Sequence, residues 1–151
     1  MAEQQQSKTV YNLAGKVIFS SERGSSAAPL GGDLTDADLR GFDLVGVDLE
    51  GVTLMGADLT DANLEGANLY WCLATDAVFE RADLRGVCFR GGQLGKADFR
   101  YARLQGADFG GDTLSGRDAD LTGAALACAE YDASTVFPKG FDPRAAGMVE
   151  V

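Results

Sequence analysis

The chain has 151 residues, 23 acidic and 13 basic side chains, a net charge of −10 and no histidine. Its length suits one domain, and its acidic balance disfavours direct binding to nucleic acid or an anionic membrane, because both repel a negative surface. The missing histidine excludes Ser-His-Asp and Cys-His catalysis and every histidine-containing metal site. Enzymes built on carboxylates or lysine remain possible, but with these classes removed we expect no enzyme and no cofactor.

Residues 1–31 are expected to form a tail, capping strands and a loop. The first residues lack the basic and apolar regions of a signal peptide, and no stretch reaches the ~20 apolar residues of a membrane helix, which predicts a cytoplasmic protein. We expect residues 1–8 to be disordered, TVYNLAGKVIF to form strands over the start of the next region, and SSERGSSAAPLGG to be a loop. The cysteines, Cys72, Cys88 and Cys128, read as reduced thiols.

A period of five residues governs the middle of the chain. From position 34 to position 114, sixteen of the seventeen residues found at every fifth place are Leu or Phe, and the unit reads A-D/N-L-x-x. An α-helix would spread such leucines around its axis, and a long strand would place alternate leucines on opposite faces. Within one unit, however, Ala and Leu point the same way, and the two remaining residues have turn chemistry.

The departures from the pattern recur every 20 residues. Thr53, Leu73, Gln93 and Thr113 replace the usual Asp or Asn, which is what a four-sided coil of 20 residues predicts. The A(D/N)LXX units resemble the pentapeptide repeat family, whose fold is a right-handed quadrilateral β-helix. The resemblance covers residues 32–116 in one frame, after which GRDADL inserts two residues and Leu121, Leu126 and Tyr131 continue in a new frame.

The resemblance implies an all-β fold with the β-helix over residues 32–131 and a C-terminal cap over residues 132–151. We expect about five coils, which stack at ~4.8 Å. Phe137 and Phe141 are expected to plug the last coil, and Asp142 with Pro143 predicts a short capping helix. The tail also resembles the ending of small cyanobacterial members. The predicted core includes Leu44, Leu64, Leu84, Leu104, Phe79, Phe89, Phe99 and Phe109.

One interruption of the repeat is a candidate interaction site. Ala74 stands where a leucine is due, and an aromatic pair precedes it. An exposed apolar patch around this corner would mark a protein contact, and it would comprise Tyr70, Trp71, Leu73, Met55 and Val78. The alternative is a small bulge that turns Leu73 inward to fill the space beside Ala74.

Rows of acidic residues form a second candidate. They are Asp38 and Asp58 on one face, Asp43 and Asp83 on another, and Asp48 and Asp108 on a third. They serve either for solvation or for mimicry of DNA, which is how family members that protect DNA gyrase from quinolones are understood. Arginines interrupt these rows in the later coils, and no loop insertion is evident inside the regular run.

Other chemistry has weaker support. The period of five does not match calcium-binding repeats, so no metal is expected. Cys88 reads as either a redox-reactive thiol between Arg85 and Arg90 or a simple exposed one. Asp112 is expected to be a turn residue in a distorted last coil. The favoured function is a non-enzymatic protein-interaction or scaffold module, monomeric or dimeric, with a modulator of DNA gyrase as the alternative.

Overall fold

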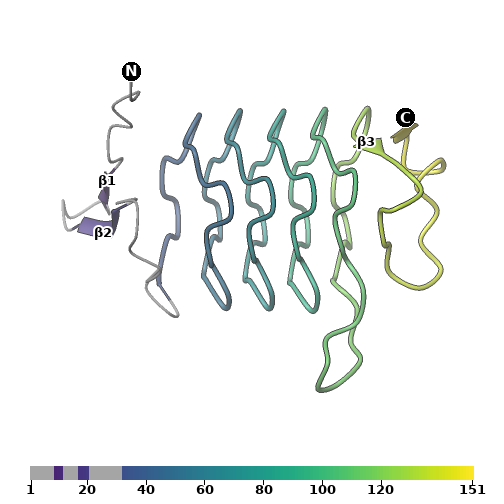
Figure 1. The fold of residues 1–151 in the computed structure, drawn as a ribbon, viewed down its shortest axis with the longest axis horizontal. Coiled ribbons are helices and arrows are strands. Elements are labelled where there is room, and N and C mark those ends of the chain that lie inside the picture. Colours follow the sequence, from purple (N-terminus) through teal and green to yellow (C-terminus); the bar gives the residue numbers. More distant parts are fainter. Residues whose placement is uncertain (1–8, 12–16, 21–31) are drawn as a thin grey trace.

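The computed structural model describes residues 32–151, together with the backbone of strands β1 (Thr9–Tyr11) and β2 (Val17–Ser20). Four-sided coils stack along one axis and end in a C-terminal cap (Figure 1). β3 (Glu130–Tyr131) belongs to the last coil, and β4 (Val149–Glu150) belongs to the cap. β1 and β2 pair in antiparallel fashion, and β3 and β4 pair in parallel. None of the described residues forms a helix that could span a membrane.

The expectations for residues 1–8 and for the loop that follows β2 lie outside the described residues. The strands expected in TVYNLAGKVIF are present as β1 and β2. Their role as a cover for the first coil stays a prediction.

A tight turn follows the larger inward-facing residue of each repeat unit, usually a Leu or Phe. In the first one, the amide of Ala37 donates to the carbonyl oxygen of Leu34 at 3.0 Å, and Asp36 between them has a φ of 56°. A single positive φ at the third residue is typical of a type II turn. The same position recurs every five residues from 36 to 106, with glycine at eight places and other residues at seven. The chain therefore turns a corner every five residues.

Parallel backbone bridges join each coil to the next and define four faces, which we name by their outward residues. The first face carries Asp33, Thr53, Leu73, Gln93 and Asp120; the second carries Asp38, Asp58, Val78, Asp98 and Ala125; the third carries Asp43, Asn63, Asp83, Arg103 and Glu130; the fourth carries Asp48, Asn68, Cys88, Asp108 and Val136. Partners are 20 residues apart in the first four coils. The right-handed quadrilateral β-helix is therefore the observed fold.

Apolar side chains fill the shaft that the coils enclose. The inward residues Leu44, Leu64, Leu84 and Leu104 are each at most 2% exposed, and Ala74 is fully buried in the same way. Fully burying a leucine side chain contributes roughly 1.5–3 kcal/mol, so this column is a main source of stability.

Phenylalanines build a continuous aromatic stack in the later coils. Phe79 and Phe99 are parallel with centroids 5.0 Å apart, and Phe89 and Phe109 repeat this arrangement at 5.0 Å. The two columns meet edge to face at 5.9–6.1 Å. Each such pair is worth about 0.5–1.5 kcal/mol beyond the area it buries.

The fifth coil begins after a loop that the repeat frame does not reveal. Gln93 bridges to Asp120 instead of residue 113, so the chain contains seven extra residues and not the two expected. Leu114 keeps the five-residue frame in sequence but is 78% exposed in the structure. The extra residues form the green loop that projects beyond the outline of the other coils in Figure 1. We call residues 110–118 the inserted loop.

The C-terminal segment closes the stack with aromatic rings. Phe137 lies parallel to Phe109 at 6.2 Å, and Phe141 stacks on Phe137 at 5.2 Å. The predicted capping helix is absent. Asp142 does cap the backbone amides of Arg144 and Ala145, but Gly147, with a φ of 79°, ends the segment after one turn.

The stacked leucines generate the first prediction. Leu64→Ala should lower the free energy of unfolding by about 2–5 kcal/mol, because it opens a cavity in a shaft without free space. Urea denaturation followed by circular dichroism measures this change. Val45→Ala, at a corner position 51% exposed, is the control and should change stability by less than about 0.5 kcal/mol. Equal effects of the two substitutions would contradict the inward placement of Leu64.

Candidate interaction surface

The aromatic pair predicted as part of a contact site lies at the corner between the fourth and first faces. Tyr70 and Trp71 stack with ring centroids 5.3 Å apart and an interplanar angle of 21°. Trp71, the only tryptophan of the chain, occupies the left-handed turn position with a φ of 57° and is 41% exposed. A bulky residue in this conformation costs about 1–2 kcal/mol relative to glycine.

The inserted loop folds back onto this aromatic pair. The amide of Thr113 donates to the Tyr70 hydroxyl oxygen at 3.1 Å, and the two hydroxyl groups are also hydrogen-bonded at 3.1 Å. Gly91 lies between Trp71 and the inserted loop. A β-carbon added to Gly91 would come 2.6 Å from Nε1 of Trp71 and 3.0 Å from Cβ of Asp112. Trp71 thus packs over Gly91, and a β-carbon at this position would force the indole to move.

Asp112 organises the inserted loop from within. Its carboxylate accepts hydrogen bonds from the amides of Leu114, Ser115 and Arg117, at 2.9, 2.6 and 3.2 Å, and from the hydroxyl of Ser115. These donors stabilise the charged form and hold the pKa of Asp112 well below its usual value of 3.8. Asp112 is 5% exposed and serves in a turn, as its position near the frame shift predicted. Sequence reasoning did not find that it anchors a loop.

The predicted apolar patch is distributed over more of the surface than one corner. Leu73 lies on the first face between Trp71 at one corner and Met55, 44% exposed, at the next. Val78 belongs to the second face, between Asp58 and Asp98. The structure therefore brings Trp71, Leu73 and Met55 to one side of the coil and leaves Val78 on another.

No bulge turns Leu73 into the shaft. Leu73 bridges Thr53 and Gln93 in regular register, and the amide of Ala74 donates to the carbonyl oxygen of Gln93 at 2.8 Å. Leu73 is half-buried on the outward side of the chain. The outward placement of Leu73 agrees with the patch hypothesis and disagrees with the repacking alternative.

The acidic residues have a structural task that the sequence analysis missed. Asp33, Asp48, Asp58, Asp98 and Asp108 each accept a hydrogen bond from the backbone amide two residues later, at 2.9–3.1 Å. The asparagines at 63 and 68 do the same. This bond supports the turn that follows, and it explains the recurrence of Asp or Asn beside each inward residue.

Arginines neutralise most of the predicted acidic rows. Arg40 binds Asp38 at 2.8 Å and lies 4.0 Å from Asp58, and its hydrogen bonds lower the pKa of Asp38 to about 2. Asp83 pairs with Arg85 at 2.6 Å and Arg103 at 3.6 Å, and Asp108 pairs with Arg90 at 3.1 Å. Within the described part of the chain, only Asp43 and Asp48 of the six predicted residues lack an ion pair, and both belong to the first coil.

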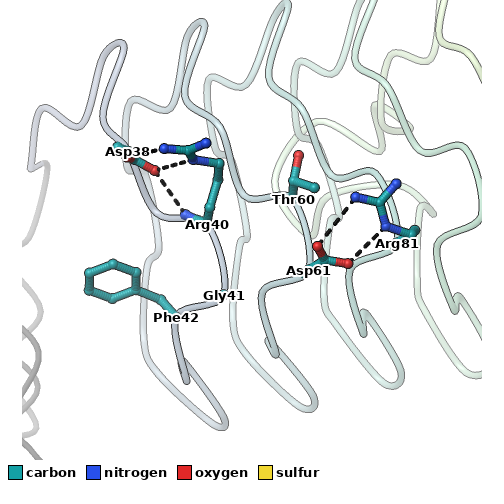
Figure 2. A pocket seen from close by; sticks show the side chains of 7 residues that line it. All are labelled: Asp38, Arg40, Gly41, Phe42, Thr60, Asp61 and Arg81. Carbon is teal, nitrogen blue, oxygen red and sulfur yellow. Dashed lines mark hydrogen bonds and ion pairs between the residues drawn. The ribbon is translucent and has the colours of Figure 1, made fainter.

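A surface depression lies at the corner between the second and third faces (Figure 2). Its lining residues are Asp38, Arg40, Gly41, Phe42, Thr60, Asp61 and Arg81. Arg40 is held by Asp38, and Arg81 pairs with Asp61 at 2.9 Å and Glu80 at 2.7 Å. Because both guanidinium groups are already paired with carboxylates, the depression offers little free charge for an anionic ligand.

The three cysteines are free and occupy different environments. Cys72 is buried, and desolvation raises its pKa to about 12, whereas Cys88 is half-buried on the fourth face and Cys128 is exposed. Among residues 32–151 and the two N-terminal strands, no group of three His, Cys, Asp or Glu side chains is arranged to hold a metal ion.

Stacked four-sided coils with a filled shaft define a repeat protein of the quadrilateral β-helix class. The family model for pentapeptide repeats matches the chain with eight copies, over residues 33–69, 62–100 and 77–116. The chain belongs to the pentapeptide repeat family.

Several solved structures are similar to this chain. A pentapeptide repeat protein from the thylakoid lumen of Arabidopsis thaliana is 28% identical, with a TM-score of 0.60 over 65% of this chain and 63% of that one. A pentapeptide repeat protein from Nostoc is 35% identical over 80% of this chain and 82% of that one, with a TM-score of 0.35. QnrB1, a plasmid-mediated fluoroquinolone resistance protein, is 22% identical over 79% and 60%, with a TM-score of 0.42. No curated protein matches the chain.

The packing of Trp71 generates the second prediction. Gly91→Ala should displace the indole and change the position and intensity of tryptophan fluorescence, because the new methyl group overlaps it. Gly51→Ala is the matched control. Gly51 has a nearly equal φ of 68° at the same corner, but a β-carbon there has no neighbour within 4 Å. Both variants should lose about 1 kcal/mol of stability from backbone strain, and only Gly91→Ala should alter the fluorescence. Unchanged fluorescence in Gly91→Ala would contradict the contact.

Proposed function

We propose that this chain is a non-enzymatic protein-interaction module whose docking surface is centred on Trp71 and extends over the first face. The observation that carries the proposal is the position of the only tryptophan, which is 41% exposed on a corner supported by Tyr70 and the inserted loop. Tryptophan is among the residues most enriched at the energetic centres of protein interfaces.

The surroundings of Trp71 support this choice of surface. The middle of the first face carries Thr53, Leu73 and Gln93, which are uncharged, whereas each of the other three faces carries at least two acidic residues among its first four positions. Met55 lies along one edge of the first face, and Leu114, in the loop bonded to Tyr70, is 78% exposed. Together they give a flat side with apolar contacts and little charge to desolvate.

The organisation of the loop also favours recognition. Asp112 orders the loop internally, and Tyr70 fixes it to a corner two coils away through Thr113. A surface that is already ordered loses less conformational entropy when a partner binds. This arrangement supports a role for the inserted loop at the border of the docking surface.

The test is an affinity capture from the extract of the source organism with the protein immobilised. The wild-type chain should retain a partner that both Trp71→Ala and Leu73→Gln lose, the latter introducing the side chain that the next coil has at the same position. Val45→Thr removes an exposed apolar side chain from another corner and should retain the partner. Circular dichroism checks that the variants fold. Equal capture by all four proteins would overturn the proposal.

A second candidate function is modulation of DNA gyrase by mimicry of DNA. The observation that favours it is the composition of the first two coils, where residues 32–72 contain nine carboxylates and one arginine. A dense negative surface of this kind competes with DNA for basic sites.

A supercoiling assay separates the two candidates. If the second one holds, the protein should inhibit gyrase or protect it from a quinolone at micromolar concentration, and Asp43→Asn with Asp48→Asn should reduce the effect because these carboxylates have no ion pair among the described residues. An assay in which supercoiling is unchanged by the protein, with and without quinolone, removes this candidate.

A further inference from the structure

The charge of the chain is unevenly distributed along the stack. Residues 32–72 contain nine acidic side chains and one arginine, whereas residues 73–109 contain five acidic and six basic ones. The basic residues of the later coils are largely engaged in ion pairs, several of which connect adjacent coils. Examples are Arg81 with Asp61, Arg85 with Glu65 and Arg100 with Glu80. Residues 110–151 contain seven acidic and three basic side chains, so the largest excess of negative charge lies in the first two coils.

Trp71 stands at the edge of this acidic part. At its corner, successive coils place Gly51, Trp71 and Gly91 in equivalent turn positions. The indole packs over Gly91 on the side of the inserted loop, and Tyr70 stacks against one of its faces. Trp71 is still 41% exposed, so part of its indole stays open to solvent.

The amide of Gly51 donates to the carbonyl oxygen of Tyr70 at 2.8 Å, which places the turn of Glu50 and Gly51 in the first coil next to the aromatic corner, and we call this turn the ledge. Its floor is Gly51, where an added β-carbon would have no atom within 4 Å. Glu50 precedes it, is exposed, and occupies the position that Tyr70 has one coil later. Asp48 lies beside it on the fourth face and accepts hydrogen bonds from the amide of Glu50 and from Nδ2 of Asn68. None of the residues described around it supplies a cation to Glu50 or Asp48.

We propose that this ledge binds an arginine side chain from a basic segment of a partner protein, a proposal that rests on the docking surface inferred above. A guanidinium group is planar, stacks on an indole face and donates to a carboxylate at the same time. Trp71 provides the face, Glu50 provides the carboxylate, and the open space over Gly51 admits the side chain. Charge complementarity with the acidic first two coils selects a basic segment over an acidic one.

Other occupants fit the surface less well. Nucleic acid is repelled by the carboxylates of the first two coils. Within residues 32–151 a second copy offers few free cations, because seven of the ten Lys and Arg residues there are in ion pairs. The chemistry of the ledge therefore favours a different, basic protein.

The test uses the full chain and an acetylated, amidated peptide in which arginine alternates with glycine. Because the chain has one tryptophan, its fluorescence reports on Trp71 alone. The arginine peptide should change this fluorescence in a saturable and salt-sensitive manner, and the peptide with glutamine in place of arginine should not. Absence of a saturable change, or an equal change with both peptides, overturns the proposal.

Variants locate the binding site by isothermal titration calorimetry. Glu50→Gln should weaken binding of the arginine peptide by about three- to fivefold, and Trp71→Leu by a similar factor. Asp43→Asn removes the same charge from an exposed position of the same coil on the third face and should leave the affinity within about twofold, because the contact is local. Equal weakening by Glu50→Gln and Asp43→Asn would show an effect of net charge and overturn the proposal.

Two further measurements keep this inference separate from the proposed function. Sedimentation velocity without peptide should show no dimer that depends on Trp71, and such a dimer would make a second copy the occupant and overturn the proposal. If the arginine peptide fails to bind while affinity capture still depends on Trp71 and Leu73, the docking surface stands and only its preference for a basic segment is wrong.

Discussion

A backbone turn with one residue in the left-handed region, repeated every five positions, is the constraint on which this structure depends. The amide of Ala37 and the carbonyl oxygen of Leu34 close the first such turn, and the pattern continues through the described coils. The turn sets the direction of the next face, which places one large apolar side chain per face in the shaft. Burial of those side chains then stabilises a coil in which no face could be stable alone.

The turns also account for much of the acidic character of the chain. Most aspartates beside the inward residues accept the amide that begins the next corner, and several are further held by arginines from the same or the adjacent coil. Exposed ion pairs contribute only about 0–1 kcal/mol each to stability, so their larger effect is to neutralise the surface of the later coils. Among the residues that the structure describes, the places without such ion pairs are the uncharged middle of the first face, the corner with Trp71 and part of the first coil.

The five-residue period excluded an α-helix and a long strand, and departures that recur every 20 residues predicted a four-sided coil. The right-handed quadrilateral β-helix followed from the resemblance of the A(D/N)LXX units to the pentapeptide repeat family. The period could not reveal the inserted loop, since Leu114 stays in the frame while its backbone has left the coil. The bond between Tyr70 and Thr113 was equally hidden, because it joins residues 43 positions apart and depends on the path of that loop. The capping helix was predicted from its start signals, whereas Gly147 ends it after one turn.

The fixed count of residues per circuit has a consequence for how this protein can change length. Adding or removing one complete circuit between Tyr70 and Gly110 would keep every column aligned and would leave the loop on the same side as the aromatic corner. The change of about 4.8 Å in their separation would still break the bond between Tyr70 and Thr113. Adding a single repeat unit would rotate all later columns by a quarter of a circle, so that the loop would emerge on a different side and lose Tyr70. Natural variation in this segment is therefore expected to occur in multiples of 20 residues wherever the loop and the aromatic corner occur together.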